Sequence, residues 1–200
     1  LAKAGNPAAF FSLEMSVRAL ASRLVAWGAK VDHTRMERRS YLSERDYARI
    51  SQAVGALTEW PLYLQETAQT LTEITAWVRR LKQEHAIVCA VVDYLQLMVS
   101  DRKSQSNREQ EVAALSRGLK RLAKTEKISV VALSQLNRSP EGRRDNRPRL
   151  SDLRESGALE NDADVAVLLF RQDQYEPTDE TSGIAELIVA KNRQGATGTC

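Results

Sequence analysis

Long hydrophobic runs and cysteines are scarce in this sequence. No stretch of about 18 apolar residues occurs, so we expect nothing to span a membrane. The first residues form no signal-peptide core and include no initiator Met, so the chain is expected to belong to a longer protein. Only Cys89 and Cys200 are present, which excludes a disulfide framework and favours a reducing, cytoplasmic location.

The composition is that of a globular domain with a substantial core. Of the 200 residues, 42% are hydrophobic and 28% are charged. No internal repeat, low-complexity segment or domain boundary is visible, so residues 1–200 are interpreted as one domain. The net charge of +3 is modest, but four arginines crowd residues 143–149. Such a loop either contacts phosphate or is simply solvated.

Apolar residues at helical spacing predict four helices, in residues 17–27, 47–57, 71–81 and 112–122. Three of them start at an N-cap signal. Ser16 precedes the first helix, Ser43 the second, and Thr70 with Glu73 forms a capping-box pattern before the third. These apolar stripes are most simply interpreted as faces that pack on a core.

Short apolar runs of strand length alternate with the predicted helices. They are residues 8–13, 62–64, 87–92, 128–133, 165–170 and 184–189. This alternation predicts an α/β fold with a mostly parallel twisted sheet flanked by helices. The last two runs are joined by a polar loop, and we expect them to form an antiparallel hairpin at one end of the sheet.

Polar side chains follow three of the predicted strands, at the edge where α/β sheets bind ligands. The apolar run of residues 86–92 ends in Asp93, which either holds Mg²⁺ beside a nucleotide or begins a turn. Glu14 either orients or deprotonates a water molecule, or is an acid favoured at a helix N-terminus. Gln135 either senses a terminal phosphate or caps its strand.

A charged segment, residues 151–164, precedes the fifth strand. Within it, Gly157 permits close approach of the backbone to a phosphate. Arg154 is placed to pair with that phosphate and Glu155 to orient the arginine, although a solvated helix is the simpler alternative.

Two cations end the last predicted strand. Lys191 and Arg193 are two residues apart, so both lie on one face if the strand continues. They suit a polyphosphate held in the same chain or in a neighbour, or they protect an edge strand by their charge.

Taken together, these segments resemble the ATPase domain of DnaB-type replicative DNA helicases. The matching segments, in family order, are residues 12–15, 93–97, 132–138, 152–157, 162–164 and 191–195. The resemblance covers nearly the whole chain, and six ordered motifs are far more specific than one. It implies a RecA-like P-loop NTPase core that uses ATP and Mg²⁺. It also implies a homohexameric ring around single-stranded DNA, with primase and a helicase loader as partners.

The resemblance assigns catalytic roles residue by residue. Glu14 matches the glutamate that activates water, and Asp93 matches the Walker B aspartate that binds Mg²⁺ through water. Gln135 matches the glutamine that couples the γ-phosphate to the DNA-binding loops. Lys191 and Arg193 match a pair that acts in trans, with Arg193 as the arginine finger.

The resemblance also assigns the contacts to DNA. Arg154, Glu155 and Gly157 match a loop that holds the DNA backbone in the channel of the ring. Residues 100–106 match a second channel loop.

One expected motif is missing. No G-x-x-x-x-G-K-[ST] occurs in the 200 residues, and the family continues into another strand after the segment that resembles residues 198–200. The matched ATPase domain is therefore expected to be truncated at both ends. We therefore expect this chain alone to bind ATP poorly and to form rings weakly or not at all. Two alternatives stay open: a RecA-like recombinase or clock-type ATPase, and a non-catalytic DNA-binding or ring-interaction remnant.

Overall fold

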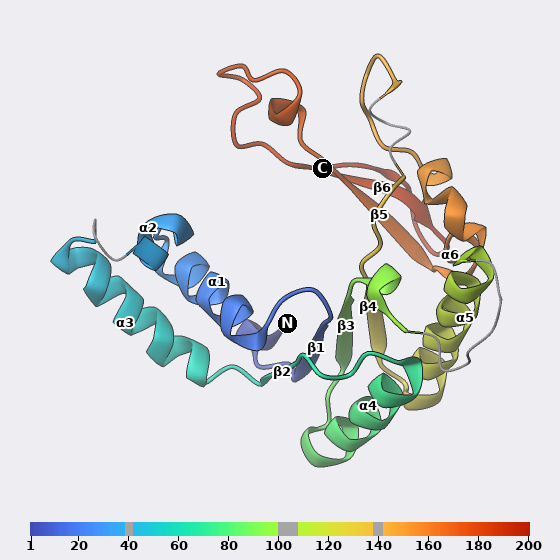
Figure 1. The fold of residues 1–200 in the computed structure, drawn as a ribbon, viewed down its shortest axis with the longest axis horizontal. Helices are drawn as coiled ribbons and strands as arrows, with labels where there is room; N and C mark the ends of the chain where they lie inside the picture. The colour runs from blue at the N-terminus through green and yellow to red at the C-terminus, as the bar shows by residue number, and fades with distance from the viewer. Residues whose placement is uncertain (39–41, 100–107, 138–141) are drawn as a thin grey trace. The chain divides into compact units, whose positions relative to one another are not determined.

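The computed structural model describes residues 1–38, 42–99, 108–137 and 142–200, and only the backbone of residues 154–156. The chain forms two compact units. Unit 1 comprises residues 1–101 and 122–133, and unit 2 comprises residues 102–121 and 134–200. Each unit contains its own β-sheet (Figure 1).

The sheet of unit 1 is parallel and has the strand order β2-β1-β3-β4. Its strands are β1 (Ala8–Ser12), β2 (Leu62–Gln65), β3 (Cys89–Asp93) and β4 (Ser129–Ala132). Phe11 of β1 and Val92 of β3 lie opposite each other and are fully buried. The predicted α/β fold with a mostly parallel sheet is therefore confirmed.

Helices α1 (Val17–Ala29), α3 (Glu44–Thr58) and α4 (Leu71–His85) confirm three of the predicted stripes and their caps. In Figure 1, α1 and α3 lie side by side, and the short α2 (His33–Arg38) lies near their end. A small core of Ala29, Val31 and Ala53 joins them. Helix α2 was not predicted, because six residues are too few to show an apolar period.

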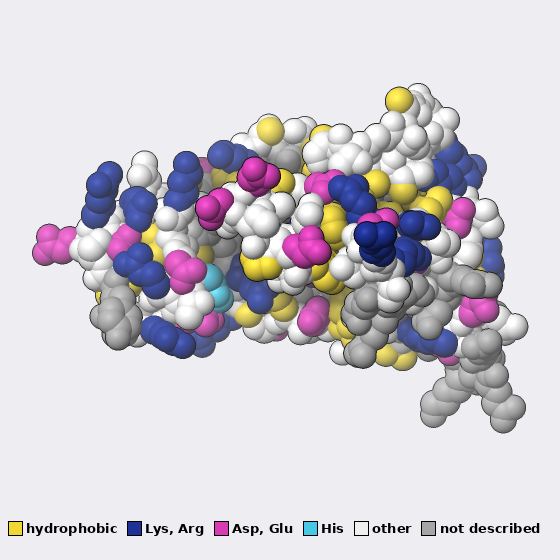
Figure 2. All heavy atoms as spheres, turned by 90° about the horizontal axis from the view of Figure 1, so that it is seen from above, with side chains coloured by type: hydrophobic (Ala, Val, Ile, Leu, Met, Phe, Trp, Pro, Cys, Tyr) yellow, Lys and Arg dark blue, Asp and Glu magenta, His cyan; other side chains and the backbone are white. Residues whose placement is uncertain are grey.

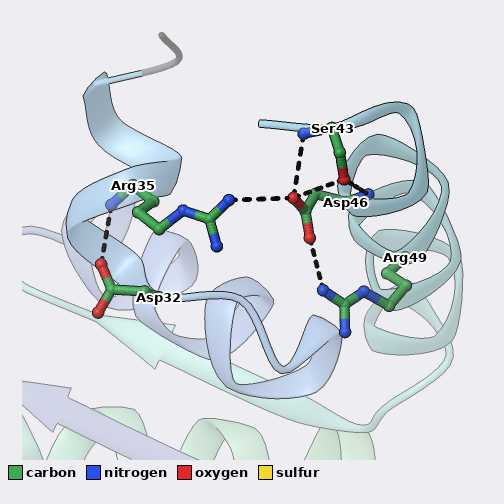
Figure 3. Close-up of polar contacts among 5 residues, drawn as sticks. All are labelled: Asp32, Arg35, Ser43, Asp46 and Arg49. Atoms are coloured by element: carbon green, nitrogen blue, oxygen red, sulfur yellow. Dashed lines mark hydrogen bonds and ion pairs between the residues drawn. The ribbon is translucent and has the colours of Figure 1, made fainter. Parts of the chain in front are cut away.

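A buried carboxylate, Asp46, ties α2 to the start of α3 (Figure 3). It accepts a hydrogen bond from the backbone N–H of Ser43 at 3.0 Å and faces the guanidinium groups of Arg35 and Arg49. Hydrogen bonds from Ser43 and Arg49 hold the pKa of Asp46 well below its usual range. Its stabilising effect is therefore complete above the usual carboxyl range and is lost only as the pH falls through the lowered pKa.

The sheet of unit 2 is antiparallel and has the order β5-β6-β7. Its strands are β5 (Val165–Phe170), β6 (Glu186–Asn192) and the two-residue β7 (Gly198–Thr199). The predicted hairpin of β5 and β6 is confirmed. Its predicted place at one end of the parallel sheet is wrong. Strand β6 pairs with β5 on one side and β7 on the other, and no described strand of unit 1 pairs with β5.

Short helical segments and one long helix also belong to the fold; the shortest are η1 (Ala2–Ala4), η2 (Leu95–Leu97) and η5 (Gln172–Gln174). Segment η4 (Leu150–Ser156) leads directly into α6 (Gly157–Asp162), which precedes β5. The fourth predicted helix is confirmed as α5 (Arg108–Glu126), whose first part belongs to unit 2 and whose last part belongs to unit 1. No helix in the described ranges is both long and apolar enough for a membrane span.

One face of the molecule carries charges of both signs (Figure 2). On the face drawn in Figure 2, acidic and basic side chains are interspersed, and Lys and Arg side chains also gather densely right of centre. A net charge of +3 on 200 residues gives no strong field of one sign. Local clusters of cations, and not the overall charge, therefore decide where an anion binds.

Candidate functional site

The chain reverses its direction of travel across the parallel sheet between β1 and β3. From β1 it passes to β2 on one side, and then it crosses back to β3 and β4 on the other. Such a switch point leaves an opening beyond the carboxyl ends of the two strands, which is where ligands bind in α/β sheets. Asp93 is the last residue of β3, and Glu14 follows β1 by two residues. Both predicted acids therefore lie at the switch point.

Backbone pairing fixes this edge of unit 1. Ser12 lies opposite Asp93, and the N–H of Leu13 donates to the carbonyl of Asp93 at 2.7 Å. The Ser12 hydroxyl is buried and accepts a hydrogen bond from the N–H of Met15 at 3.2 Å. The turn that carries Glu14 is thereby held against the end of β3.

The electrostatics at this edge are unfavourable for a bare carboxylate. Partial burial, with the nearby negative charge of Glu14, raises the pKa of Asp93 above its usual value, and Arg23 offsets only part of this. A cation at the same place would relieve both effects, since Mg²⁺ prefers oxygen ligands and commonly uses one or two carboxylates plus phosphate oxygens. No group of three or more His, Cys, Asp or Glu side chains within the described ranges would hold a metal by itself. The residues therefore fit a Mg²⁺ ion that arrives with a phosphate ligand.

The raised pKa of Asp93 predicts that Asp93→Asn stabilises the fold while it removes the proposed metal ligand. The folded state disfavours the ionised carboxylate, so the wild-type penalty is full above the raised pKa and disappears as the pH falls below the usual carboxyl range. At neutral pH we expect the melting temperature to rise, by an amount that solvent screening limits because this carboxylate is partly exposed.

Thermal unfolding at several pH values, without metal or nucleotide, measures this effect. The exposed Asp179→Asn variant is the control and should melt like wild type. If Asp93→Asn lowered the melting temperature at neutral pH, the ionised carboxylate would be stabilising and the electrostatic interpretation would be wrong.

Gln135 lies three residues beyond β4, the strand that pairs with β3. Its side chain is exposed. Gln135 belongs to unit 2, whereas Glu14 and Asp93 belong to unit 1. Its position after β4 agrees with the strand end expected from the sequence, and its role stays a prediction.

Lys191 and Arg193 lie together, as their spacing predicts. Lys191 lies opposite Ala166, one residue before the end of β6, and its ammonium group donates to the carbonyls of Glu160 and Asn161. The guanidinium of Arg193 donates to the same Asn161 carbonyl at 2.5 Å. Both cations therefore bind the carboxyl end of α6, where free carbonyls carry partial negative charge.

Asp164 joins these cations to α5. It pairs with Lys120 and, at 3.3 Å, with Arg193. The Lys120 hydrogen bond, assisted by the charges of Arg193 and Lys191, lowers the pKa of Asp164. In addition, the Ser116 hydroxyl donates to Asp162 at 2.6 Å. Arg193 is still 49% exposed, so it is held in place without being closed off from solvent.

Lys120 and Ser116 were not predicted as part of this group. They lie 44 and 46 residues from the aspartates they bind, on a helix whose apolar stripe indicates only packing. A polar residue on a helix carries no local signal for such a distant partner. The sequence signals for this region were the i, i+2 spacing of Lys191 and Arg193 and the acidic segment of residues 162–164.

Gly157 is the described part of the predicted DNA-binding segment, and it is the first residue of α6. Its backbone is right-handed helical, and a Cβ atom added there would meet nothing within 4 Å. Neither the backbone conformation nor the space around this position therefore requires glycine. The side chains of Arg154 and Glu155, and the predicted channel loop at residues 100–106, lie outside the described part of the structure.

Comparison with known proteins is consistent with this geometry. The family model for the DnaB-like helicase C terminal domain matches residues 1–200. The chain belongs to the DnaB-like helicase C-terminal domain family. Replicative DNA helicase DnaB of Leifsonia xyli subsp. xyli is 48% identical over 194 residues, covering 96% of this chain and 42% of that protein. DnaB of Geobacillus stearothermophilus is 41% identical over 198 residues, covering 98% of this chain and 43% of that protein.

Solved structures agree with membership of the DnaB-like family. One of them, the structure of an ATPase domain, superposes with a TM-score of 0.93 at 34% identity, over 99% of this chain and 71% of that one. A DnaB-like replicative helicase, whose structure was described with its interactions with primase, also gives a TM-score of 0.93 at 34% identity. It is matched over 48% of its length. The RecA-like fold is therefore confirmed, and the chain spans less than half of the curated DnaB relatives named above.

Proposed function

We propose that this chain forms part of the ATP-hydrolysing motor of a replicative DNA helicase, which moves on single-stranded DNA and unwinds duplex at the replication fork. The observation that carries the proposal is the pair of acids, Glu14 and Asp93, at the switch point of a parallel sheet. Membership of the DnaB-like family gives this pair its interpretation as part of a nucleotide site.

Each acid has a distinct role in the proposed reaction. Glu14 is exposed, so it is free to accept the proton of the water that attacks the γ-phosphate. Asp93 would hold Mg²⁺ through a bound water, and the ion would neutralise charge on the phosphates. The amide of Gln135, beyond the neighbouring strand β4, would respond to loss of the γ-phosphate without carrying a charge of its own.

Lys191 and Arg193 are assigned to the site of a neighbouring subunit. ATP would lie between subunits of a homohexamer, with Glu14 and Asp93 on one side and the two cations on the other. The side chain of Arg193 is 49% exposed, which supports this assignment because an arginine finger must reach across the interface to the neighbouring site. Arg193 would stabilise charge that develops on the transferred phosphoryl group.

The DNA contact is assigned to Arg154, Glu155 and Gly157. Phosphate contacts dominate such a surface, so binding should depend on salt and hardly on base sequence. Primase and a helicase loader are the proposed partners of the full-length protein. The solved DnaB-like helicase studied for its interactions with primase supports the first of them.

Gly157→Ala and Arg154→Ala test the DNA assignment in the protein at its natural length. Alanine fits the helical backbone of Gly157 without a clash, so the fold should be unchanged or slightly more stable. We expect Gly157→Ala to weaken DNA binding by keeping the backbone away from the phosphate. Arg154→Ala should flatten the plot of log Kd against log salt by ~0.7 for each single-strand phosphate that the side chain no longer neutralises.

Strand displacement on forked duplexes, with anisotropy titrations of a labelled oligothymidylate, measures both effects. Gly55→Ala, in α3 of unit 1, is the matched control because a Cβ atom there also meets nothing within 4 Å. If neither substitution changed DNA affinity or its salt dependence, the assigned DNA contact would be wrong. Unwinding with 5′-to-3′ polarity would separate a helicase from a recombinase, which pairs strands instead.

A further inference from the structure

The basic loop, residues 143–149, contains two arginines that the protein itself holds and two that face solvent. Arg143 is one of the two arginines that contacts within the protein hold in place. Two nitrogens of its guanidinium donate to the two carboxylate oxygens of Asp152, a residue that is only 2% exposed. Arg143 also donates to the carbonyl of Arg147 at 2.9 Å. The hydrogen bonds from Arg143, with one from the N–H of Arg149, lower the pKa of Asp152. Arg143 therefore fixes the loop to η4.

Arg147 is the second arginine that the protein holds. Its guanidinium binds both carboxylate oxygens of Glu186 on β6 at 2.5 Å. The same group lies over the ring of Phe170 on β5, 5.1 Å from the centroid. These contacts anchor the loop to the antiparallel sheet through the Nη2 group and the ring contact of Arg147.

Arg144 and Arg149 are the two arginines of the basic loop that face solvent. Arg144 is exposed and makes no hydrogen bond or ion pair with any described residue. Arg149 has a 60% exposed side chain, and its ion pair with Asp145 is long, at 3.5 Å. Together with Arg143 and Asp145 they line an open hollow of about 690 Å³. One exposed carboxylate therefore faces three arginines in this hollow.

The chemistry of the hollow favours a phosphodiester. A guanidinium presents paired N–H donors that match phosphate oxygens, and it is weakly hydrated for a cation. The loop leads directly into η4, which carries the residues assigned to DNA. We propose that Arg144 and Arg149 bind phosphates of the single-stranded DNA and so extend the DNA-binding surface beyond Arg154 and Gly157. This inference rests on the proposed function.

A neighbouring hollow indicates a strand and not a free polyphosphate. It has a volume of about 170 Å³, and its lining includes Arg144, Asp145 and Tyr175. Tyr175 is 45% exposed, and its ring stacks at 6.0 Å on Phe170. Sites for single strands combine cations that follow the backbone with exposed aromatic rings on which bases stack. Tyr175 offers such a ring beside the phosphate contacts.

The double variant R144Q/R149Q, in the protein at its natural length, tests the phosphate contacts. Removing both cations should flatten the plot of log Kd against log salt by about 1.4 for each subunit that holds the strand. Between 50 and 200 mM salt, the affinity of the wild type should therefore fall about seven times further than that of R144Q/R149Q, for each subunit that holds the strand. R144K/R149K keeps both charges and should therefore keep the wild-type slope. R45Q/R171Q removes two exposed arginines from α3 and from the loop after β5, and it should keep the wild-type slope.

Tyr175→Leu tests the base contact by a different signature. Stacking releases no counterions, so affinity should fall about tenfold at every salt concentration while the slope stays that of wild type. Tyr175→Phe keeps the ring and should bind like wild type. Anisotropy with a labelled oligothymidylate gives all of these values, and competition by tripolyphosphate gives the affinity for a free anion.

The outcomes separate this inference from the proposed function. If R144Q/R149Q folded and kept the wild-type slope while Arg154→Ala flattened it, the inference would be wrong and the proposed function would stand. If Arg154→Ala had no effect either, the DNA contact assigned under the proposed function would be wrong as well. If R144Q/R149Q kept the DNA slope but no longer bound tripolyphosphate, the hollow would hold a free polyphosphate and not the strand.

Discussion

Arg193→Ala is expected to lower ATP turnover by ~10³–10⁵-fold in the assembled, DNA-stimulated protein, the usual effect of removing an arginine finger. The reason is electrostatic, because alanine leaves no charge to stabilise the transferred phosphoryl group. Steady-state phosphate release per subunit measures the loss. Arg171→Ala is the matched control, since Arg171 is an exposed arginine of the same unit whose ion pair among the described residues is local, with Asp173. It should retain wild-type turnover.

Mixing two inactive variants decides whether Arg193 acts in trans. A subunit with Arg193→Ala still has Glu14, and a subunit with Glu14→Gln still has Arg193. In mixed rings, some interfaces combine the intact acid of one subunit with the intact finger of the next, so part of the turnover should return. If native mass spectrometry found mixed rings and no turnover returned, action in trans would be excluded.

Glu14→Gln is expected to lower turnover by ~10²–10⁴-fold, the range that general base catalysis contributes. Glutamine has nearly the same shape as glutamate but cannot accept the proton of the attacking water. Nucleotide affinity should change little, because the assigned role of Glu14 concerns the water and not the phosphates. Single-turnover hydrolysis and titration with a fluorescent ATP analogue measure the two quantities separately.

Glu59→Gln controls for loss of a negative charge, since Glu59 lies at the end of α3 with its side chain exposed. It should leave both quantities unchanged. A Glu14→Gln protein that bound nucleotide poorly and hydrolysed whatever it bound at the wild-type rate would contradict the assigned role.

Local signals in the sequence predicted much of the fold. The capping boxes at Ser43 and Thr70 act within three residues, so their helices could be recognised before any tertiary contact was known. The continuous apolar run before Asp93 likewise indicated a strand covered on both faces. The switch point then followed from strand order, which the sequence alone does not determine.

Features that depend on distant partners could not be predicted. The four arginines of the basic loop look alike in sequence, yet Arg143 and Arg147 are held by carboxylates 9 and 39 residues away. The separate antiparallel sheet includes the two-residue β7, which is too short to show an alternating pattern. The partners of Lys191 within the chain include backbone carbonyls, which every residue has and no sequence pattern marks.

Helix α6 has a mechanical consequence that follows from its length. It contains six residues, so its two ends are only about 9 Å apart. One end is Gly157, and the other is gripped by Lys191 and Arg193. The grip of the two cations therefore lies within about two helical turns of the backbone that is assigned to DNA. A movement of the cations that shifts their end of α6 would have only this short path to reach Gly157.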